Sequence, residues 1–227
     1  MKREIIITDD GSSTIHIPEW NEQYHSKHGA IQEAYHVFIK HGLHHLSHSQ
    51  LKLKHNNSIA ILEIGLGTGL NAFITCLEAE KLKLNINYVG VEGYPVKSEE
   101  ISHLNYVTQL NAKKKQQIFE KIHNTTWEEK HQLNTNFVLT KQQKMFKDIN
   151  VQNEFNLIYF DAFGARVQPE LWTEPVFKNM YNALKENGVL VTYAAKGSVR
   201  RAMQSVGFTV ERLPGPPGKR EMLRATK

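Results

Sequence analysis

Three glycines stand between an apolar run and a segment with helical spacing, in "EIGLGTGLN". Gly65, Gly67 and Gly69 allow the backbone to turn tightly and to approach a ligand closely at the start of a helix. The dinucleotide fingerprint G-x-G-x-x-G requires a third glycine at position 70, which is Leu70 here. The pattern G-x-G-x-G therefore predicts a nucleotide-like ligand other than a dinucleotide, or else a tight turn that binds nothing.

Two acidic residues narrow the choice of ligand. Glu63 ends the apolar run before the glycines, and a carboxylate there needs a polar partner, which a cationic amino-acid moiety would supply. Glu92 ends a second apolar run in "VGVEGYP" and can accept both hydroxyls of a ribose. A pyrophosphate would prefer fewer carboxylates nearby, so the pattern favours S-adenosylmethionine. The residues expected to bind it are Glu63, Gly65, Gly67, Thr68, Gly69, Asn71 and Glu92.

A third acid, Asp161, follows the apolar run of "FDAFGARVQPELW". In a sheet with alternating strands and helices it would face the same cleft; the alternative is an aspartate that caps the following turn. Phe163 and Trp172 could present flat aromatic surfaces to a base, although Trp172 could equally belong to the core of its helix.

Basic side chains cluster in two short segments, "AKGSVRR" and "GKRE". Both are candidates for contacts with nucleic-acid phosphates, and the alternative is a solvated helix face and a solvated turn. The formal charge of +5 and a pI near 9.1 permit such a partner without requiring it. The candidate residues are Lys196, Arg200, Arg201, Lys219 and Arg220.

The histidines of "HGLHHLSH" form pairs one helical turn apart, His41 with His45 and His44 with His48. No cysteine or carboxylate is interleaved to complete a set of metal ligands. We therefore expect a polar helix face and no metal site.

The elements that must position these residues alternate along the chain. Residues 33–46, 68–82, 169–188 and 197–207 have helical spacing or helix end signals, and residues 96–130 should form two helices. Apolar runs predict strands at 56–65, 85–95, 155–163, 189–195, 208–214 and 221–227, and residues 131–143 should form a hairpin or one strand. Continuous apolar strands between helices predict an open, doubly wound α/β sheet that is mostly parallel.

Length and composition indicate one domain over residues 1–227, because 227 residues fit a single core. We expect a helical extension over residues 1–57 and a Rossmann-like core over residues 58–227. No apolar run approaches the roughly 18 residues of a membrane span. The apolar run in the first residues, "MKREIIITDD", is too short for the apolar region of a signal peptide. A cytoplasmic protein is expected, with the lone Cys76 packed in the core.

Five segments together resemble the methyltransferase domain of the MnmC family, in order and spacing: "LEIGLGTGLNAF", "VEGYP", "FDAFGARVQPELWT", "VTYAAKGSVRRAMQSVGFTVE" and "PGPPGKREML". "YHSKHGAIQEAYHVFI" extends the resemblance toward the N-terminus. Two positions depart from the family. Asp161 is followed by "AFGAR" with Gln168 before the proline, and Gln142 and Gln143 replace the acid that many methyltransferases place near the adenine.

The resemblance implies a class I methyltransferase fold with an antiparallel last strand. It also implies N-methylation, by S-adenosylmethionine, of the aminomethyl group of 5-aminomethyl-(2-thio)uridine at the tRNA wobble position, so that tRNA is bound at its anticodon region. The two-domain relatives carry a flavin-dependent oxidoreductase, for which this chain has no residues left; a separate pathway would supply the substrate. Competing hypotheses are an aminopropyltransferase of the spermidine synthase type or a small-amine methyltransferase, and, in another class, a non-catalytic tRNA-binding module.

In this interpretation Asp161 is the catalytic residue. The acceptor amine is largely protonated near neutrality and must lose a proton before its nitrogen can attack. A carboxylate beside an amine favours the charged form, whereas desolvation and a neighbouring sulfonium act in the opposite direction. We therefore expect Asp161 to orient the amine more than it deprotonates it.

Overall fold

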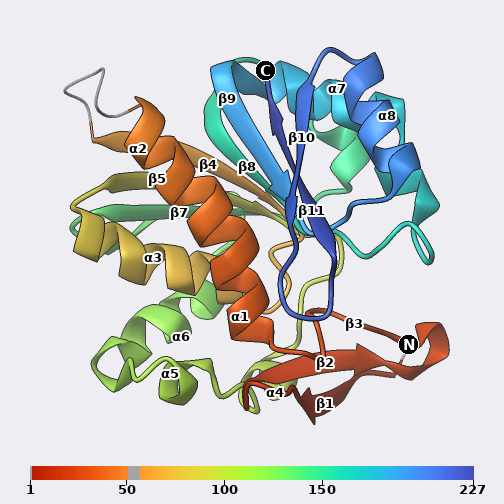
Figure 1. Cartoon of the computed structure of the whole chain (residues 1–227). Helices are drawn as coiled ribbons and strands as arrows, with labels where there is room; N and C mark the ends of the chain where they lie inside the picture. The colour runs from red at the N-terminus through yellow and green to blue at the C-terminus, as the bar shows by residue number, and fades with distance from the viewer. Residues whose placement is uncertain (1, 51–56) are drawn as a thin grey trace.

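A twisted eight-stranded sheet forms the centre of the computed structural model, which describes residues 2–50 and 57–227 (Figure 1). The strand order is β10-β11-β9-β8-β4-β5-β7-β6. The strands are β4 (Ser58–Ile64), β5 (Asn85–Val91), β6 (Lys130–Asn134), β7 (Phe137–Gln142), β8 (Phe155–Phe160), β9 (Leu184–Thr192), β10 (Thr209–Pro214) and β11 (Glu221–Thr226). The five strands β7, β5, β4, β8 and β9 run parallel, and β11, β10 and β6 are antiparallel to their neighbours. The predicted doubly wound, mostly parallel sheet with an antiparallel last strand is confirmed, and residues 131–143 form the hairpin alternative.

The ends of three central strands lie in one row, because Ile64 pairs with both Val91 and Phe160. The next residues continue the row through backbone hydrogen bonds: Gly65 N donates to Val91 O at 3.0 Å, and Asp161 N donates to Ile64 O at 2.9 Å. In parallel sheets the carboxyl ends of strands are where ligands bind. The register therefore places the glycines, Glu92 and Asp161 on one rim, as the sequence predicted.

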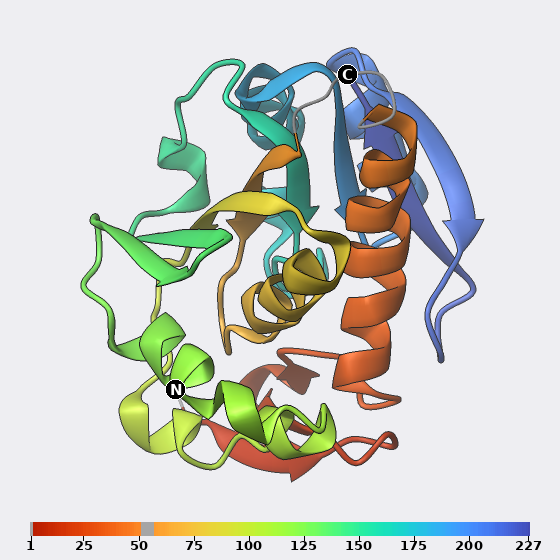
Figure 2. The same cartoon turned by 90° about the vertical axis from the view of Figure 1, so that its left-hand side faces the viewer.

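Helices cover both faces of the sheet and create two apolar cores. One face carries α1 (Ala30–Ala34), the π-helix η2 (Tyr35–His44), α2 (His45–Gln50), α3 (Leu70–Leu82) and α6 (Gln116–Asn124). The other carries α7 (Glu174–Ala183) and α8 (Gly197–Ser205). Figure 2 shows η2 and α3 side by side on their shared face. Burial of the strands on both faces explains why their sequences are continuously apolar.

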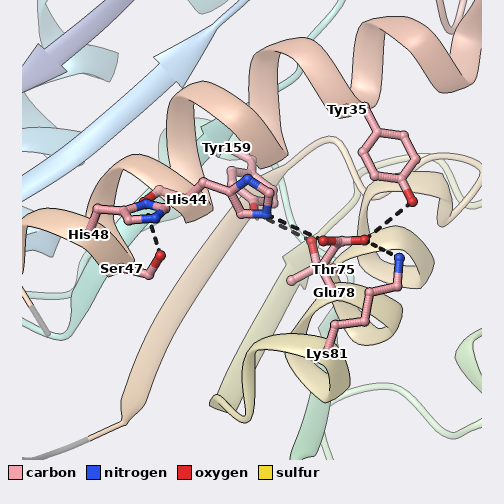
Figure 3. A network of polar contacts seen from close by, with 8 residues as sticks. All are labelled: Tyr35, His44, Ser47, His48, Thr75, Glu78, Lys81 and Tyr159. Atoms are coloured by element: carbon pink, nitrogen blue, oxygen red, sulfur yellow. Dashed lines mark hydrogen bonds and ion pairs between the residues drawn. The ribbon is translucent and has the colours of Figure 1, made fainter.

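The continuous helix from α1 to α2 packs unusually close to the sheet. A Cβ added at Gly42 would lie 3.1 Å from Val191 Cγ2 and 3.2 Å from the Tyr159 ring, so a larger residue would push the helix outward. The helix is joined to α3 by polar contacts as well (Figure 3): Glu78 accepts from Lys81 Nζ at 2.6 Å and lies 3.3 Å from His44 Nε2. The histidine row of the sequence thus includes a residue that joins two helices. Among residues 2–50 and 57–227, no cluster of three or more potential metal ligands occurs.

The first residues differ from the predicted helical extension. They form a small antiparallel sheet of β1 (Glu4–Ile7), β2 (Ser13–Ile17) and β3 (Glu22–Gln23), followed by helix only from Ala30. The sheet lies beside the rim where the central strands end (Figure 1). Local patterning was weak here because no residue of β1 is fully buried and β3 is two residues long.

Three further local predictions were imprecise. Residues 96–130 contain four short helical elements rather than two helices: α4 (Ser98–Ile101), α5 (Tyr106–Gln109), η3 (Lys113–Lys115) and α6. The helix expected from Pro169 is divided into η5 (Pro169–Trp172) and α7, because Pro175 begins a new helix within its first turn. Its expected last residues, 184–188, belong to β9 instead. The remaining short elements are η1 (Pro18–Trp20) and η4 (Phe146–Asp148).

Cys76 is buried, as predicted. No helix in the described part of the chain combines the length and the apolar character that crossing a bilayer requires.

Candidate active site

The turn after β4 has a backbone that favours glycine. Gly65 and Gly67 have φ angles of +88° and +47°, in the left-handed region that L side chains rarely adopt. A Cβ at Gly65 would also lie 2.7 Å from the Asp161 carbonyl oxygen. The glycines therefore let the turn lie directly against the residue that ends β8.

Glu92 is held by the backbone of two loops. Its Oε2 accepts from Gly67 N at 3.0 Å, and its Oε1 accepts from Tyr94 N at 2.9 Å. Two backbone donors fix the direction of the carboxylate, while each oxygen keeps a lone pair for another donor. This geometry suits an acceptor for two neighbouring hydroxyls.

Asp161 belongs to a buried chain of side chains that the sequence did not indicate. Asn71 Nδ2 donates to both Asp161 Oδ2 at 2.8 Å and Glu63 Oε1 at 2.9 Å, and Tyr88 Oη donates to Glu63 Oε2 at 2.8 Å. The Asn71 Oδ1 atom is buried and has no hydrogen-bond partner within the described residues. Asn71 thus joins two acids and leaves one buried acceptor free.

Burial controls the protonation of both acids. Desolvation, together with the nearby Glu33 carboxylate, raises the pKa of Asp161 to about 7, although the hydrogen bond from Asn71 and the Lys219 ammonium oppose the increase. Desolvation also raises the pKa of Glu63 well above its ordinary value, against the hydrogen bonds from Asn71 and Tyr88. Burial thus shifts both carboxyls of this cluster toward their protonated forms, and Asp161 titrates near neutral pH.

A cavity of about 680 Å³ brings several of the predicted site residues together, and its lining is mainly apolar. Seven predicted residues line it: Gly65, Gly67, Thr68, Asn71, Glu92, Asp161 and Phe163. Glu63, Gly69 and Trp172 are not part of the lining. Glu63 is fully buried below Asn71, so its polar partners come from the protein, not from a ligand as the sequence suggested.

Trp172 belongs to the core, which decides between the two alternatives for this residue. Its side chain packs against Phe160, and the residue is 5% exposed. Its Nε1 donates to the Phe163 carbonyl at 2.8 Å, so it supports the loop after Asp161 from below. Trp172 does not line the cavity, so its position favours the core alternative over a contact with a base.

The predicted basic residues differ in exposure. Lys196, Arg201 and Arg220 are exposed, and Arg200 is partly buried. Lys219 differs from them because its ammonium contacts the Glu33 carboxylate and lies over the Tyr193 ring, 3.8 Å from the ring centroid.

Several residues that line the cavity were absent from the predicted set. Trp20, Tyr24 and His25 come from the N-terminal segment, and Met145 and Phe146 follow β7. The "YHSKHGAIQ" segment resembles the family, but its residue types did not indicate a binding role. Trp20 packs edge-on against Phe163, a contact between residues far apart in the sequence. Gln142 and Gln143, the residues at the position of the missing acid, do not line the cavity.

A second cavity of about 560 Å³ shares only Leu66, Gly67 and Glu92 with the first. Its lining includes Lys141, whose Nζ donates to the His123 carbonyl at 2.6 Å. Asn71 and Asp161 do not reach it. The cavity of about 680 Å³ is therefore the candidate active site, because it alone of the two contains both the glycine turn and Asp161.

The fold and this site define a class of enzyme. Residues 105–227 match a family model described as S-adenosyl-L-methionine-dependent methyltransferase, more than half of the 227-residue chain, and the protein belongs to that family. Its cofactor is S-adenosylmethionine, in agreement with the prediction from the glycines and acids.

Similar proteins carry a more specific name. The chain is 26% identical over 212 residues to the tRNA 5-methylaminomethyl-2-thiouridine biosynthesis bifunctional protein MnmC of Hydrogenovibrio crunogenus, covering 89% of this chain and 31% of the relative. It is 27% identical over 228 residues to the protein of the same name from a Marinomonas species, covering 94% and 32%. The chain thus spans about a third of the length of the curated relatives it matches.

Solved structures agree with the fold. The crystal structure of MnmC2 from Aquifex aeolicus superposes with a TM-score of 0.77 at 25% identity, covering 99% of this chain and 69% of that one. Spermidine synthase from Thermotoga maritima superposes with a TM-score of 0.51 at 16% identity, covering 98% and 72%, which shows a shared fold only.

The residues present fit S-adenosylmethionine. The free Asn71 Oδ1 is a buried acceptor suited to an ammonium, and Glu92 is suited to the ribose hydroxyls. Met145 and Phe146 line the cavity with apolar surface suited to an adenine, which explains how the site can bind a base without the usual acid.

Proposed function

We propose that this protein transfers a methyl group to the primary amine of 5-aminomethyl-(2-thio)uridine at the wobble position of tRNA, producing 5-methylaminomethyl-(2-thio)uridine. The observation that carries the proposal is the half-buried carboxyl of Asp161, which faces the same cavity as the glycine turn and Glu92. The printed names of the relatives, which refer to tRNA 5-methylaminomethyl-2-thiouridine biosynthesis, support the choice of acceptor. A chain acting on tRNA in this way would meet its substrate in the cytoplasm.

S-Adenosylmethionine supplies the methyl group when bound: the amine lone pair forms the new N–C bond as the C–S bond breaks, and sulfur keeps that electron pair. Asp161 accepts a hydrogen bond from the amine and so directs the remaining lone pair, a contribution of position. Asn71 holds one oxygen of Asp161 at 2.8 Å, which leaves the other oxygen for the acceptor. The proton that the amine loses on becoming a nucleophile passes to Asp161 or to water.

The loop after Asp161 is suited to a flipped-out base. The Phe163 ring lines the cavity and is fixed by edge contacts with Trp20 at 5.7 Å and Tyr24 at 5.0 Å between ring centroids. Aromatic faces are common platforms for unstacked RNA bases. We assign Phe163 to the uridine ring and the aminomethyl group to Asp161.

The decisive experiment supplies purified protein with S-adenosylmethionine and tRNA that contains 5-aminomethyl-uridines, followed by mass spectrometry of the nucleosides. We expect conversion of 5-aminomethyl-uridine to its N-methyl form. Unchanged nucleosides with active protein would refute the acceptor assignment. A parallel reaction with decarboxylated S-adenosylmethionine and putrescine tests the aminopropyltransferase alternative, which the fold shared with spermidine synthase keeps relevant.

The exposed basic residues at the start of α8 are proposed to contact tRNA phosphates. Replacing both Lys196 and Arg201 by Gln should weaken tRNA binding, and the slope of log affinity against log salt should become shallower by about 1.4–1.8 for two lost contacts. Lys114→Gln is the matched control, because this lysine is also exposed but lies on η3. A salt slope equal to that of the unmodified protein would remove these residues from the interface.

A further inference from the structure

The turn between β10 and β11 brings Lys219 from the far end of the sequence onto the ring of Tyr193, whose hydroxyl is hydrogen-bonded to the residue after Asp161. Figure 1 shows this turn beside the N-terminal sheet. Lys219 Nζ contacts Glu33 Oε1 on α1, where the Glu33 side chain is only 6% exposed. The Glu33 Oε2 atom accepts from Ser26 N at 2.7 Å, so both carboxylate oxygens are engaged.

The position of the ammonium is fixed on a second side. It lies 3.8 Å from the centroid of the Tyr193 ring, a favourable cation–π geometry. Tyr193 Oη in turn donates to the carbonyl of Ala162, the neighbour of Asp161, at 2.8 Å. The turn is also attached through the Pro214 carbonyl, 2.8 Å from His36 Nε2. These contacts keep a positive charge next to the Asp161 segment.

The charges around Asp161 come from several elements. The acids are Glu63 on β4 and Glu33 on α1, and the phenols are Tyr88 on β5 and Tyr193 after β9. His25 is nearby and fully buried, and desolvation lowers its pKa to about 4, so it is neutral at physiological pH. Among the described residues that act on the Asp161 carboxyl, the cation is Lys219.

An acceptor amine placed between these acids would be held as an ammonium, which has no lone pair. A positive charge fixed near it has the opposite effect, because it disfavours a second cation. We propose that Lys219 is a positioning residue that favours the uncharged acceptor amine beside Asp161, and that Glu33 sets how much of its charge the site experiences. The inference rests on the proposed methylation of a primary amine. It gives Lys219 a role other than the phosphate contact considered from the sequence.

Lys219 and Glu33 carry opposite charges, so removing one or the other should shift the pH dependence of methylation in opposite directions. Single-turnover methylation at saturating tRNA and S-adenosylmethionine is measured from pH 6 to 10, and the rate should rise with pH to a plateau. Lys219→Met should move the midpoint to higher pH by about one unit, equal to roughly tenfold in rate below the midpoint. Glu33→Gln should move it to lower pH, and the double variant should return toward the unmodified value.

Two further variants separate this role from alternatives. Lys219→Arg retains the charge and should restore the unmodified midpoint, and Lys114→Met, on the exposed surface of η3, should leave it unchanged. If Lys219→Met instead makes the slope of log tRNA affinity against log salt shallower and leaves the pH midpoint unchanged, Lys219 contacts a phosphate and the inference is overturned. Equal midpoints in all variants would also overturn it. Failure of the unmodified protein to methylate the amine would instead refute the proposed function.

Discussion

Glu92 and Asp161 lie one residue beyond the same row of strand ends, yet the protein holds them in different ways. Glu92 accepts hydrogen bonds from two backbone N–H groups of neighbouring loops. Asp161 accepts from a side chain, Asn71, which it shares with the buried Glu63. Backbone donors make the first acid a fixed acceptor, whereas burial among other acids raises the pKa of Asp161 to about 7.

In the proposed function, this difference allows one rim to perform two tasks. An acceptor for ribose hydroxyls needs only a constant direction, and rigid loop backbone provides it. A group that handles an amine works best with a pKa near the working pH, which requires desolvation and neighbouring charges. Side chains from β4, α1, α3 and the β10–β11 turn supply those conditions at Asp161.

The largest expected effect tests the task assigned to Asp161. Asp161→Asn should reduce single-turnover methylation by about 10²–10⁴-fold, since it removes a charged hydrogen-bond acceptor from the reacting amine. The dissociation constant of S-adenosylmethionine, measured by calorimetry, should change less than about threefold. Asp148→Asn, an exposed acid on η4, is the control and should leave both values unchanged. A full-rate Asp161→Asn variant would exclude Asp161 from the chemistry.

Glu92 should show the reverse pattern. Glu92→Gln should weaken S-adenosylmethionine binding by about tenfold, because charged acceptors contribute roughly 1.5–3 kcal/mol per hydrogen bond and Gln retains part of that. The methylation rate at saturating cofactor should change much less. The exposed Glu99→Gln on α4 serves as the control in the same titration. If Glu92→Gln affected only the rate, the division of tasks between the two acids would be wrong.

The smallest effect concerns stability. The folded-state pKa of Asp161, about 7, exceeds the ordinary value of 3.8, so the folded protein binds this proton more tightly than the unfolded chain. At low pH the Asp161 carboxyl is protonated in both the folded and the unfolded state and has no effect on stability. As pH rises from about 4 to 7, the preference for the proton in the folded state lowers the free energy of unfolding increasingly. Asparagine does not titrate, so Asp161→Asn should gain about 1–2 kcal/mol in free energy of unfolding at pH 8 relative to its difference at pH 6. Urea unfolding at both pH values measures this gain, and a pH-independent difference would contradict it.

Much of the rim was predictable because its residues follow strands with strong local patterns. "SIAILEI" and "FNLIYF" are continuously apolar, and Glu63, Gly65 and Asp161 follow from where these runs end. Glu63 was nevertheless assigned to the cofactor, because a strand pattern does not reveal which side chain from α3 will cover its end. Trp172 was ambiguous for the same reason: an aromatic residue at a helix start fits a core or a cleft equally well.

The order of strands and glycines along the chain was sufficient to predict the class of fold, the cofactor and the position of Asp161 on the rim, because each depends on residues close in sequence. The protonation of Asp161 depends on contacts across long separations, since Glu33 and Lys219 are 186 positions apart and meet only when the β10–β11 turn reaches α1. Desolvation is likewise a property of everything packed around a group. The chemistry available to Asp161 is therefore a consequence of tertiary packing, while its location on the rim follows from local sequence.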